Sequence, residues 1–168
     1  QLHALSQEFV DHAFHETVTL SKLRLAMADL SRHEKDMVIQ YESPEQLSLA
    51  NMHWEKTRTE INRLMAVMQE GEADEDNAVL QEMAVKLKDY SAAVEPVVAN
   101  IKASGYDSAT VANRMLARAH DKYAAMLADM KKIETIIETE AAAVQAEEAQ
   151  TSRQTQLWFG IAVALAVL

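Results

Sequence analysis

Apolar residues recur along most of the chain at alternating steps of three and four residues, the spacing of inward-facing positions in packed helices. One such seam runs through residues 47–68, a second through 80–101 and a third through 116–137. Their members are Leu47, Ala50, Trp54, Thr57, Ile61, Leu64 and Met68; Leu80, Met83, Leu87, Tyr90, Val94, Val97 and Ile101; and Leu116, Ala119, Tyr123, Met126, Met130, Ile133 and Ile137. Each segment carries one seam, so we predict three helices that each bury one face.

The segment before residue 41 carries two apolar stripes instead of one. The first stripe consists of Leu20, Leu23, Met27, Leu30 and Met37. The second is rotated around the helix and consists of Phe14, Val18, Ser21, Leu25, Ala28, Arg32, Lys35 and Ile39. A helix with two stripes packs in two directions, here into its own bundle and against a partner. We therefore predict a homodimer interface formed by Val18, Leu25, Ala28 and Ile39.

Turn and capping residues divide the chain into four helices joined by short loops. Ser43, Pro44 and Gln46 predict a capping box with proline at the first helical position. Further boundaries are expected at Gly71, Asp74 to Asn77, Ser104-Gly105, and Asp107 or Ser108 as the last N-cap. No stop signal follows Thr110, so the last helix is expected to continue into the C-terminal tail. Short loops favour an all-α fold, an up-down-up-down antiparallel four-helix bundle whose first and fourth helices extend toward a membrane.

The C-terminal residues Leu157 to Leu168 contain no charged or polar side chain. A membrane span needs about 20 such residues, and this run is still apolar where the sequence ends. Trp158 lies at its edge, where interfacial aromatic residues are found. We expect residues 1–156 to form a domain outside the membrane and residues 157–168 to begin a truncated transmembrane helix. The alternative is a C-terminal helix that packs into its own core.

Composition excludes several classes of function. The chain has 168 residues, a net charge of −10 and no cysteine, which argues against nucleic acid as a partner and against thiolate chemistry. None of its six histidines follows a glutamate by three residues, the spacing of di-iron bundles. Glycine-rich phosphate loops and Gly-x-Ser-x-Gly motifs are also missing from the sequence. We therefore expect no enzyme activity, no metal site and no cofactor.

A few cationic and hydroxyl side chains occupy unusual places and are our candidates for ligand contacts. At 1.5 Å rise per residue, Arg32, Thr57, Tyr90 and Arg118 lie roughly 15–20 Å below the turns at Ser43 and Gly105, and Arg114 lies about 10 Å below them. Pro96 is expected to interrupt and kink the third helix near this level, freeing the carbonyl of Ala92. Arginines grip carboxylates bidentately, so we predict a ligand with two or three carboxylates, of the malate or citrate type. The competing interpretation is that these arginines are solvated and pair with neighbouring acids.

The chain resembles the extracytoplasmic sensor domain of a bacterial methyl-accepting chemotaxis receptor. The segment Leu30-Ser31-Arg32-His33-Glu34-Lys35-Asp36-Met37 is similar to stretches of helix one in such domains, in which an arginine precedes Glu-Lys-Asp. The resemblance covers the whole chain and is carried more by architecture than by motifs. In the aspartate-receptor branch, arginines of helix one and residues that open helix four hold a carboxylate at the dimer interface.

By position, the resemblance assigns Arg32 to the first group and Asn113, Arg114 and Arg118 to the second. The sequence departs from that branch because it lacks a dense arginine cluster on helix one. An interface site and a pocket inside each bundle, toward Thr57 and Tyr90, therefore both stay open.

The resemblance implies a chemoreceptor in the inner membrane in which residues 1–156 form the periplasmic sensor domain and bind a small carboxylate. Helix four would carry the signal to a cytoplasmic kinase and adaptor. The sensor domain of a membrane histidine kinase and a structural bundle without a ligand are the alternatives.

Overall fold

The computed structural model describes residues 2–70 and 75–166, with side chains at 14–70, 75–146 and 149–150. It contains the helices α1 (Leu2–Ile39), α2 (Pro44–Met68), α3 (Glu75–Lys102), α4 (Ala109–Met115) and α5 (Ala117–Ala166). Every regular element among the described residues is a helix, so the all-α class is confirmed.

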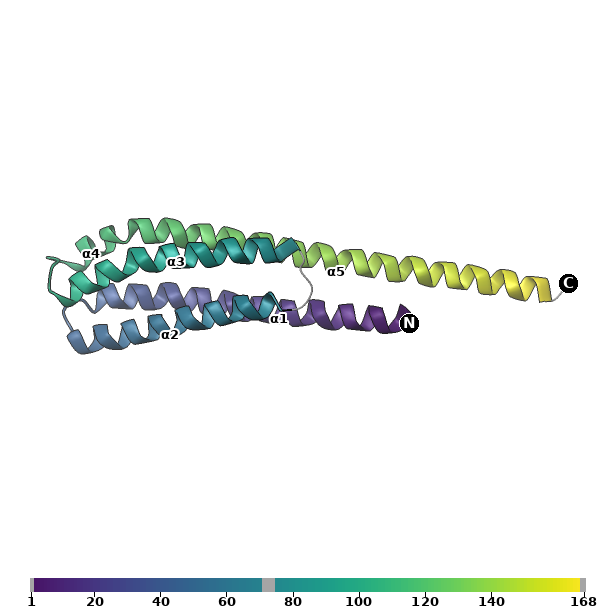
Figure 1. The fold of residues 1–168 in the computed structure, drawn as a ribbon, viewed down its shortest axis with the longest axis horizontal. Helices are drawn as coiled ribbons and strands as arrows, with labels where there is room; N and C mark the ends of the chain where they lie inside the picture. Colours follow the sequence, from purple (N-terminus) through teal and green to yellow (C-terminus); the bar gives the residue numbers. More distant parts are fainter. Residues whose placement is uncertain (1, 71–74, 167–168) are drawn as a thin grey trace.

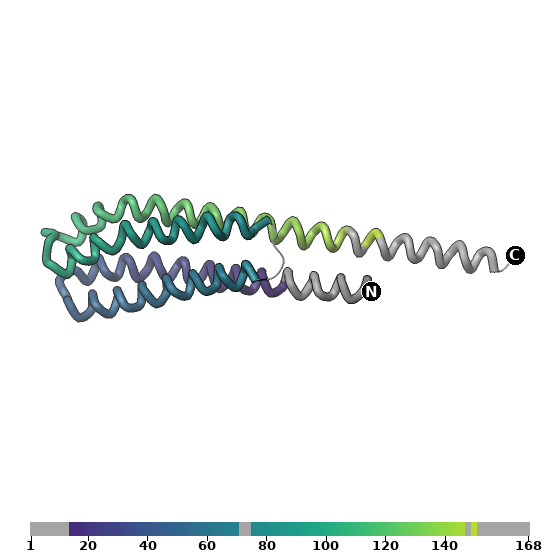
Figure 2. The backbone as a smooth tube through the Cα atoms, in the orientation of Figure 1, coloured from purple at the N-terminus to yellow at the C-terminus, as the bar shows by residue number. Residues whose placement is uncertain are grey.

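The helices pack side by side in two principal pairs, α1 with α2 and α3 with α5 (Figure 1). Smaller contacts join α1 to α5 and α2 to α3. The turn between α1 and α2, the turn after α3 and the short helix α4 all lie at one end of the molecule, which we call the tip (Figure 1). From the tip, α5 runs past the beginning of α3, as the coloured part of its trace shows in Figure 2.

The predicted seams form the hydrophobic core. The predicted seam residues of α3 are all buried. Those of α2, of α5 and Leu116 before it are buried too, except that Thr57 and Tyr123 are half-buried. The first stripe of α1 is buried as well. Its second stripe faces outward: Phe14 is 71%, Leu25 69% and Ile39 68% exposed. Ala28 is also exposed and Val18 is half-buried.

One of the predicted helix caps differs from expectation and another is confirmed. Pro44 does begin α2, but the Ser43 side chain makes no capping hydrogen bond, so that half of the capping box is not formed. Ser108, one of the two candidates, caps α4 by accepting a hydrogen bond from the Val111 N–H at 3.2 Å. The expected boundary at Gly71 and Asp74 lies outside the described residues.

The turn after α3 places a serine in the left-handed region. Ser104 has φ 55°, and its N–H donates to the Ile101 carbonyl at 2.9 Å. The N–H of Gly105 donates to the Asn100 carbonyl at 2.8 Å. This pair of bonds is the Schellman arrangement, in which the left-handed position usually belongs to glycine. Here Ser104 takes that position and Gly105 follows it.

Two expectations about helix continuity are wrong. Pro96 does not interrupt α3, which continues to Lys102; its missing N–H still leaves the Ala92 carbonyl without a helical donor. The last helix, in contrast, is divided at Leu116, where φ is −84° and ψ is 0°. The Leu116 N–H donates to the Asn113 carbonyl at 3.1 Å, which closes α4 with a tight turn. The short helix α4 contacts both α1 and α3.

No helix in the described part of the chain is at once long enough and apolar enough to cross a membrane. The predicted membrane segment, residues 157–168, lies outside the region with described side chains.

Candidate functional site

A buried carboxylate, Glu34 of α1, joins side chains from three other helices. One of its oxygens accepts a hydrogen bond from the Tyr90 hydroxyl of α3 at 2.6 Å. The other lies 2.7 Å from Nε2 of His120 on α5. Trp54 of α2 donates its indole N–H to the Tyr90 oxygen at 3.2 Å. One hydrogen-bonded chain, which we call the Glu34 network, therefore links α2, α3, α1 and α5.

The electrostatics of the Glu34 network follow from unequal burial. The Glu34 side chain is 3% exposed, whereas the His120 side chain is 42% exposed. Where Glu34 is ionised it can only accept hydrogen bonds, and Nε2 of His120 is then the donor in this contact. Burial, followed by the charge of Glu34, raises the pKa of Tyr90 far above its ordinary value. Tyr90 therefore stays a neutral donor at every physiological pH.

The Glu34 network is only partly visible in the sequence. Tyr90 was predicted as a ligand contact, but its side chain is fully buried and its hydroxyl donates to Glu34. Glu34 itself was missed, although a signal exists. The buried stripe of α1 steps from Met27 to Leu30 and then to Met37, and residue 34 is the omitted position in that series. A charged residue at a seam position is the pattern of a buried polar site.

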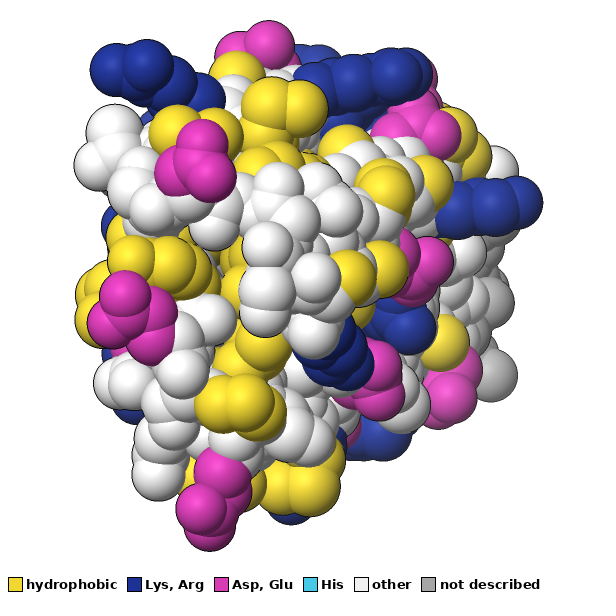
Figure 3. All heavy atoms as spheres, turned by 90° about the vertical axis from the view of Figure 1, so that its left-hand side faces the viewer, with side chains coloured by type: hydrophobic (Ala, Val, Ile, Leu, Met, Phe, Trp, Pro, Cys, Tyr) yellow, Lys and Arg dark blue, Asp and Glu magenta, His cyan; other side chains and the backbone are white. Residues whose placement is uncertain are grey.

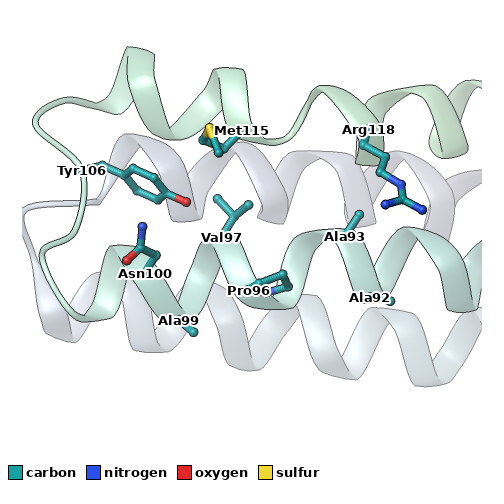
Figure 4. Close-up of a pocket in the computed structure, with 9 residues that line it drawn as sticks. All are labelled: Ala92, Ala93, Pro96, Val97, Ala99, Asn100, Tyr106, Met115 and Arg118. Atoms are coloured by element: carbon teal, nitrogen blue, oxygen red, sulfur yellow. The ribbon is translucent and has the colours of Figure 1, made fainter.

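A second candidate site is a surface groove of about 680 Å³ between α3 and the junction of α4 with α5. Its lining residues are Ala92, Ala93, Pro96, Val97, Ala99, Asn100, Tyr106, Met115 and Arg118 (Figure 4). We call it the Arg118 groove. Figure 4 shows the Arg118 guanidinium at one end of the row and Tyr106 with Asn100 at the other.

Arginines of the described helices differ in whether an acid already satisfies them. At the tip, positive and negative side chains are interspersed (Figure 3). Arg24, Arg32, Arg58 and Arg63 form ion pairs with Glu134, Asp29, Glu95 and Glu60 at 2.6 to 2.8 Å. Among arginines with described side chains, Arg114 and Arg118 alone make no ion pair with a described residue. They lie on either side of the break at Leu116.

The structure does not bring all the predicted ligand residues into one groove. Arg118 lines the Arg118 groove, and Tyr90 belongs to the Glu34 network. Asn113 and Arg114 are exposed on α4 and Thr57 is half-buried on α2; none of these lines the groove. Arg32 is exposed on the outward stripe of α1 and bonds to Asp29 at 2.8 Å. Within one chain, the candidates therefore occupy several separate surfaces.

Other charged contacts tie α3 to α5. The fully buried carboxylate of Asp129 pairs with Lys86 at 2.5 Å, and Asp89 pairs with Lys122 at 2.9 Å. Hydrogen bonding to Lys122 lowers the pKa of Asp89, and the nearby charge of Arg118 lowers it further. Arg118 is therefore close enough to an acid to feel its field without forming an ion pair.

No group of three or more acidic or histidine side chains within the described region is arranged to hold a metal ion. Comparisons of the chain with models of protein families, with curated proteins and with solved structures give no match.

Proposed function

We propose that this chain is the ligand-binding sensor domain of a transmembrane chemoreceptor and that it recognises a small organic acid. The observation that carries the proposal is the pair of unpaired arginines, Arg114 and Arg118, on the two sides of the break at Leu116. In a chain with a net charge of −10, two unsatisfied guanidinium groups only four residues apart favour local anion binding.

The proposed architecture is an up-down-up-down antiparallel four-helix bundle. In this arrangement α1, α2 and α3 are its first three helices, and α4 with α5 forms the fourth. The α1–α2 and α3–α5 pairs and the turns at the tip support it. Helices α1 and α5 would then extend toward the inner membrane from a periplasmic domain, with α5 continuing into the membrane.

The break at Leu116 offers a way to convert binding into signal. A ligand that bridges Arg114 and Arg118 would contact α4 and α5 together. If it binds one position of α5 more tightly by about 2–3 kcal/mol, it shifts a balanced two-state equilibrium almost completely. The long helix α5 would carry that displacement to a cytoplasmic kinase and adaptor.

Two guanidinium groups suit a ligand with at least two carboxylates, and malate and citrate are of this kind. Arg32 would contribute through a homodimer, because it lies on the outward stripe of α1 with the predicted interface residues. In that case Asp29, which now pairs with Arg32, would have to release it.

The test is a binding screen of organic acids by thermal shift, followed by titration calorimetry on the chain. A ligand that binds only the folded protein raises its melting temperature. We expect Arg114→Gln and Arg118→Gln each to weaken binding by about 1.5–3 kcal/mol, the value of a hydrogen bond to a charged group. Arg63→Gln is the matched control, since Arg63 is an exposed arginine already paired with Glu60. A protein whose melting temperature responds to no organic acid would contradict the proposal.

A further inference from the structure

We propose that the Arg118 groove selects a monocarboxylate with a compact apolar body. This inference rests on the proposed function, in which the chain senses organic acids, and it adds a ligand class that Arg118 would hold in the groove without Arg114. It depends on three features of the groove: a single unpaired cation, an apolar middle and uncharged polar groups at the far end.

The charge of the groove suits one carboxylate. Arg118 is the only charged residue among those that line it, and no described acid forms an ion pair with its guanidinium. Arg114 does not line the groove. The charge of Arg118 also lowers the pKa of Asp89, so Arg118 already interacts with one carboxylate nearby. A second ligand carboxylate in the groove would have no cation of its own, and burying it would be costly.

The middle of the groove suits an apolar body. Pro96 and Val97 of α3 lie below it and Met115 of α4 lies above it, between the two polar ends (Figure 4). Met115 is 56% exposed, so a ligand there would cover apolar surface that water now contacts. A thioether also adapts to ligands of different shape.

The far end of the groove carries groups without charge. The Tyr106 hydroxyl points along the groove toward Val97, and the Asn100 amide lies beside it (Figure 4). These groups can hydrogen-bond water or a neutral substituent of a ligand. The apolar body of a ligand would therefore end at these groups. Because they carry no charge, they would not bind a second carboxylate.

The experiment compares three six-carbon probes on the full chain: hexanoate, adipate and 1-hexanol. Titration calorimetry or ligand-observed NMR gives the dissociation constants. We expect hexanoate to bind at least about tenfold more tightly than either adipate, which adds a second carboxylate, or hexanol, which removes the only one. The three molecules share a chain length, so the comparison isolates charge.

Variants place the binding on this groove. Arg118→Gln and Met115→Glu should each weaken hexanoate binding by about tenfold or more, the second because it adds a negative charge above the groove. Both positions are exposed, and an unchanged melting temperature verifies that the variants fold. The matched control is Arg63→Gln, at an exposed arginine already paired with Glu60, and it should leave hexanoate affinity unchanged.

The outcomes separate this inference from the proposed function. If malate or citrate binds while hexanoate does not, the sensor proposal stands and the monocarboxylate groove is overturned. Hexanoate binding that survives Arg118→Gln also overturns the groove. Failure of every organic acid to bind overturns both.

Discussion

At the scale of single residues, Glu34 stands where the buried stripe of α1 would otherwise have an apolar side chain. Moving a carboxylate out of water costs several kcal/mol unless hydrogen bonds replace its hydration. The Tyr90 hydroxyl and Nε2 of His120 lie at hydrogen-bonding distances of 2.6 and 2.7 Å from its two oxygens. Because each partner comes from a different helix, the cost is offset only when α1, α3 and α5 are in register. Glu34 therefore specifies one arrangement of the helices.

Removing the carboxylate should be strongly destabilising. Glu34→Ala leaves a cavity and takes the partner from the buried Tyr90 hydroxyl, so we expect a loss of about 3–5 kcal/mol of unfolding free energy. Glu34→Gln keeps the shape and one acceptor and should lose less. Urea denaturation measures both variants, with Lys35→Ala at the exposed neighbouring position as control. Equal stability of Glu34→Ala and the parent chain would show that the network contributes nothing.

His33, next to Glu34, makes stability depend on pH. Its ring stacks on His53 at 5.3 Å. Burial, then the charges of Arg32 and His53, lower its pKa below the ordinary 6.5. The unfolded chain thus takes up a proton at His33 before the folded chain does, and stability is lost as pH falls below about 6.5.

The prediction is that His33→Gln flattens this dependence. One differential proton corresponds to at most about 1.4 kcal/mol per pH unit. Urea midpoints recorded between pH 7.5 and 5 should fall less steeply in the variant than in the parent chain. The exposed His15 provides the control substitution, His15→Gln. An unchanged slope in His33→Gln would exclude His33 as the source.

At the scale of elements, helix ends show how local preference and tertiary packing compete. Ser108 caps α4 as a serine at that position should. After α3, the left-handed position belongs to Ser104 although glycine is the next residue. A non-glycine residue there costs about 1–2 kcal/mol. The hydrogen bonds to the Ile101 and Asn100 carbonyls, which form when the turn lies at Ser104, offset this cost.

Replacing Ser104 by glycine should therefore stabilise the protein. We expect Ser104→Gly to raise the unfolding free energy by about 0.5–1 kcal/mol, since relief of the left-handed strain exceeds the entropy that glycine adds to the unfolded chain. Thermal or urea denaturation measures the change. Ser104→Ala is the control, because it removes the hydroxyl but keeps the Cβ atom that causes the strain. A gain of the same size in both variants would point to the hydroxyl instead.

At the scale of the whole molecule, the outward stripe of α1 carries large apolar side chains that no described part of the chain covers. These are Phe14, Leu25 and Ile39, all at least 68% exposed. Exposed apolar side chains on one face are typical of protein–protein contacts, and a stripe along a single helix suits self-association about a two-fold axis. The surface therefore supports the predicted homodimer.

We expect the chain to form a weak, symmetric dimer through this stripe. The double variant Leu25→Glu/Ile39→Glu should abolish association in sedimentation experiments, because it places four like charges at the interface of a dimer. Helicity by circular dichroism should be unchanged, since both positions are exposed. Val85→Glu is the control, at an apolar position of α3 that is 62% exposed. Dimers that persist in the double variant but not in Val85→Glu would move the interface to α3.

The sequence by itself determined the helices and which face of each is buried. Helical periodicity is local, so the series from Leu47 to Met68 shows its buried side without knowledge of its neighbours. The same argument separated the two stripes of α1. Helix ends were accessible where a proline or a cap marks them, as at Pro44 and Ser108.

Tertiary structure decided which side chains meet. The seam of α1 could not show that Glu34 faces Tyr90 and His120, which are 56 and 86 residues away along the chain. Nor could local spacing show that Lys86 pairs with Asp129, 43 residues away, while Arg118 forms no ion pair with a described residue. No proline or glycine lies near the break at Leu116, so the sequence gives no local signal for it. These features depend on the rotation and register of packed helices, which are set by many distant contacts together and not by local spacing.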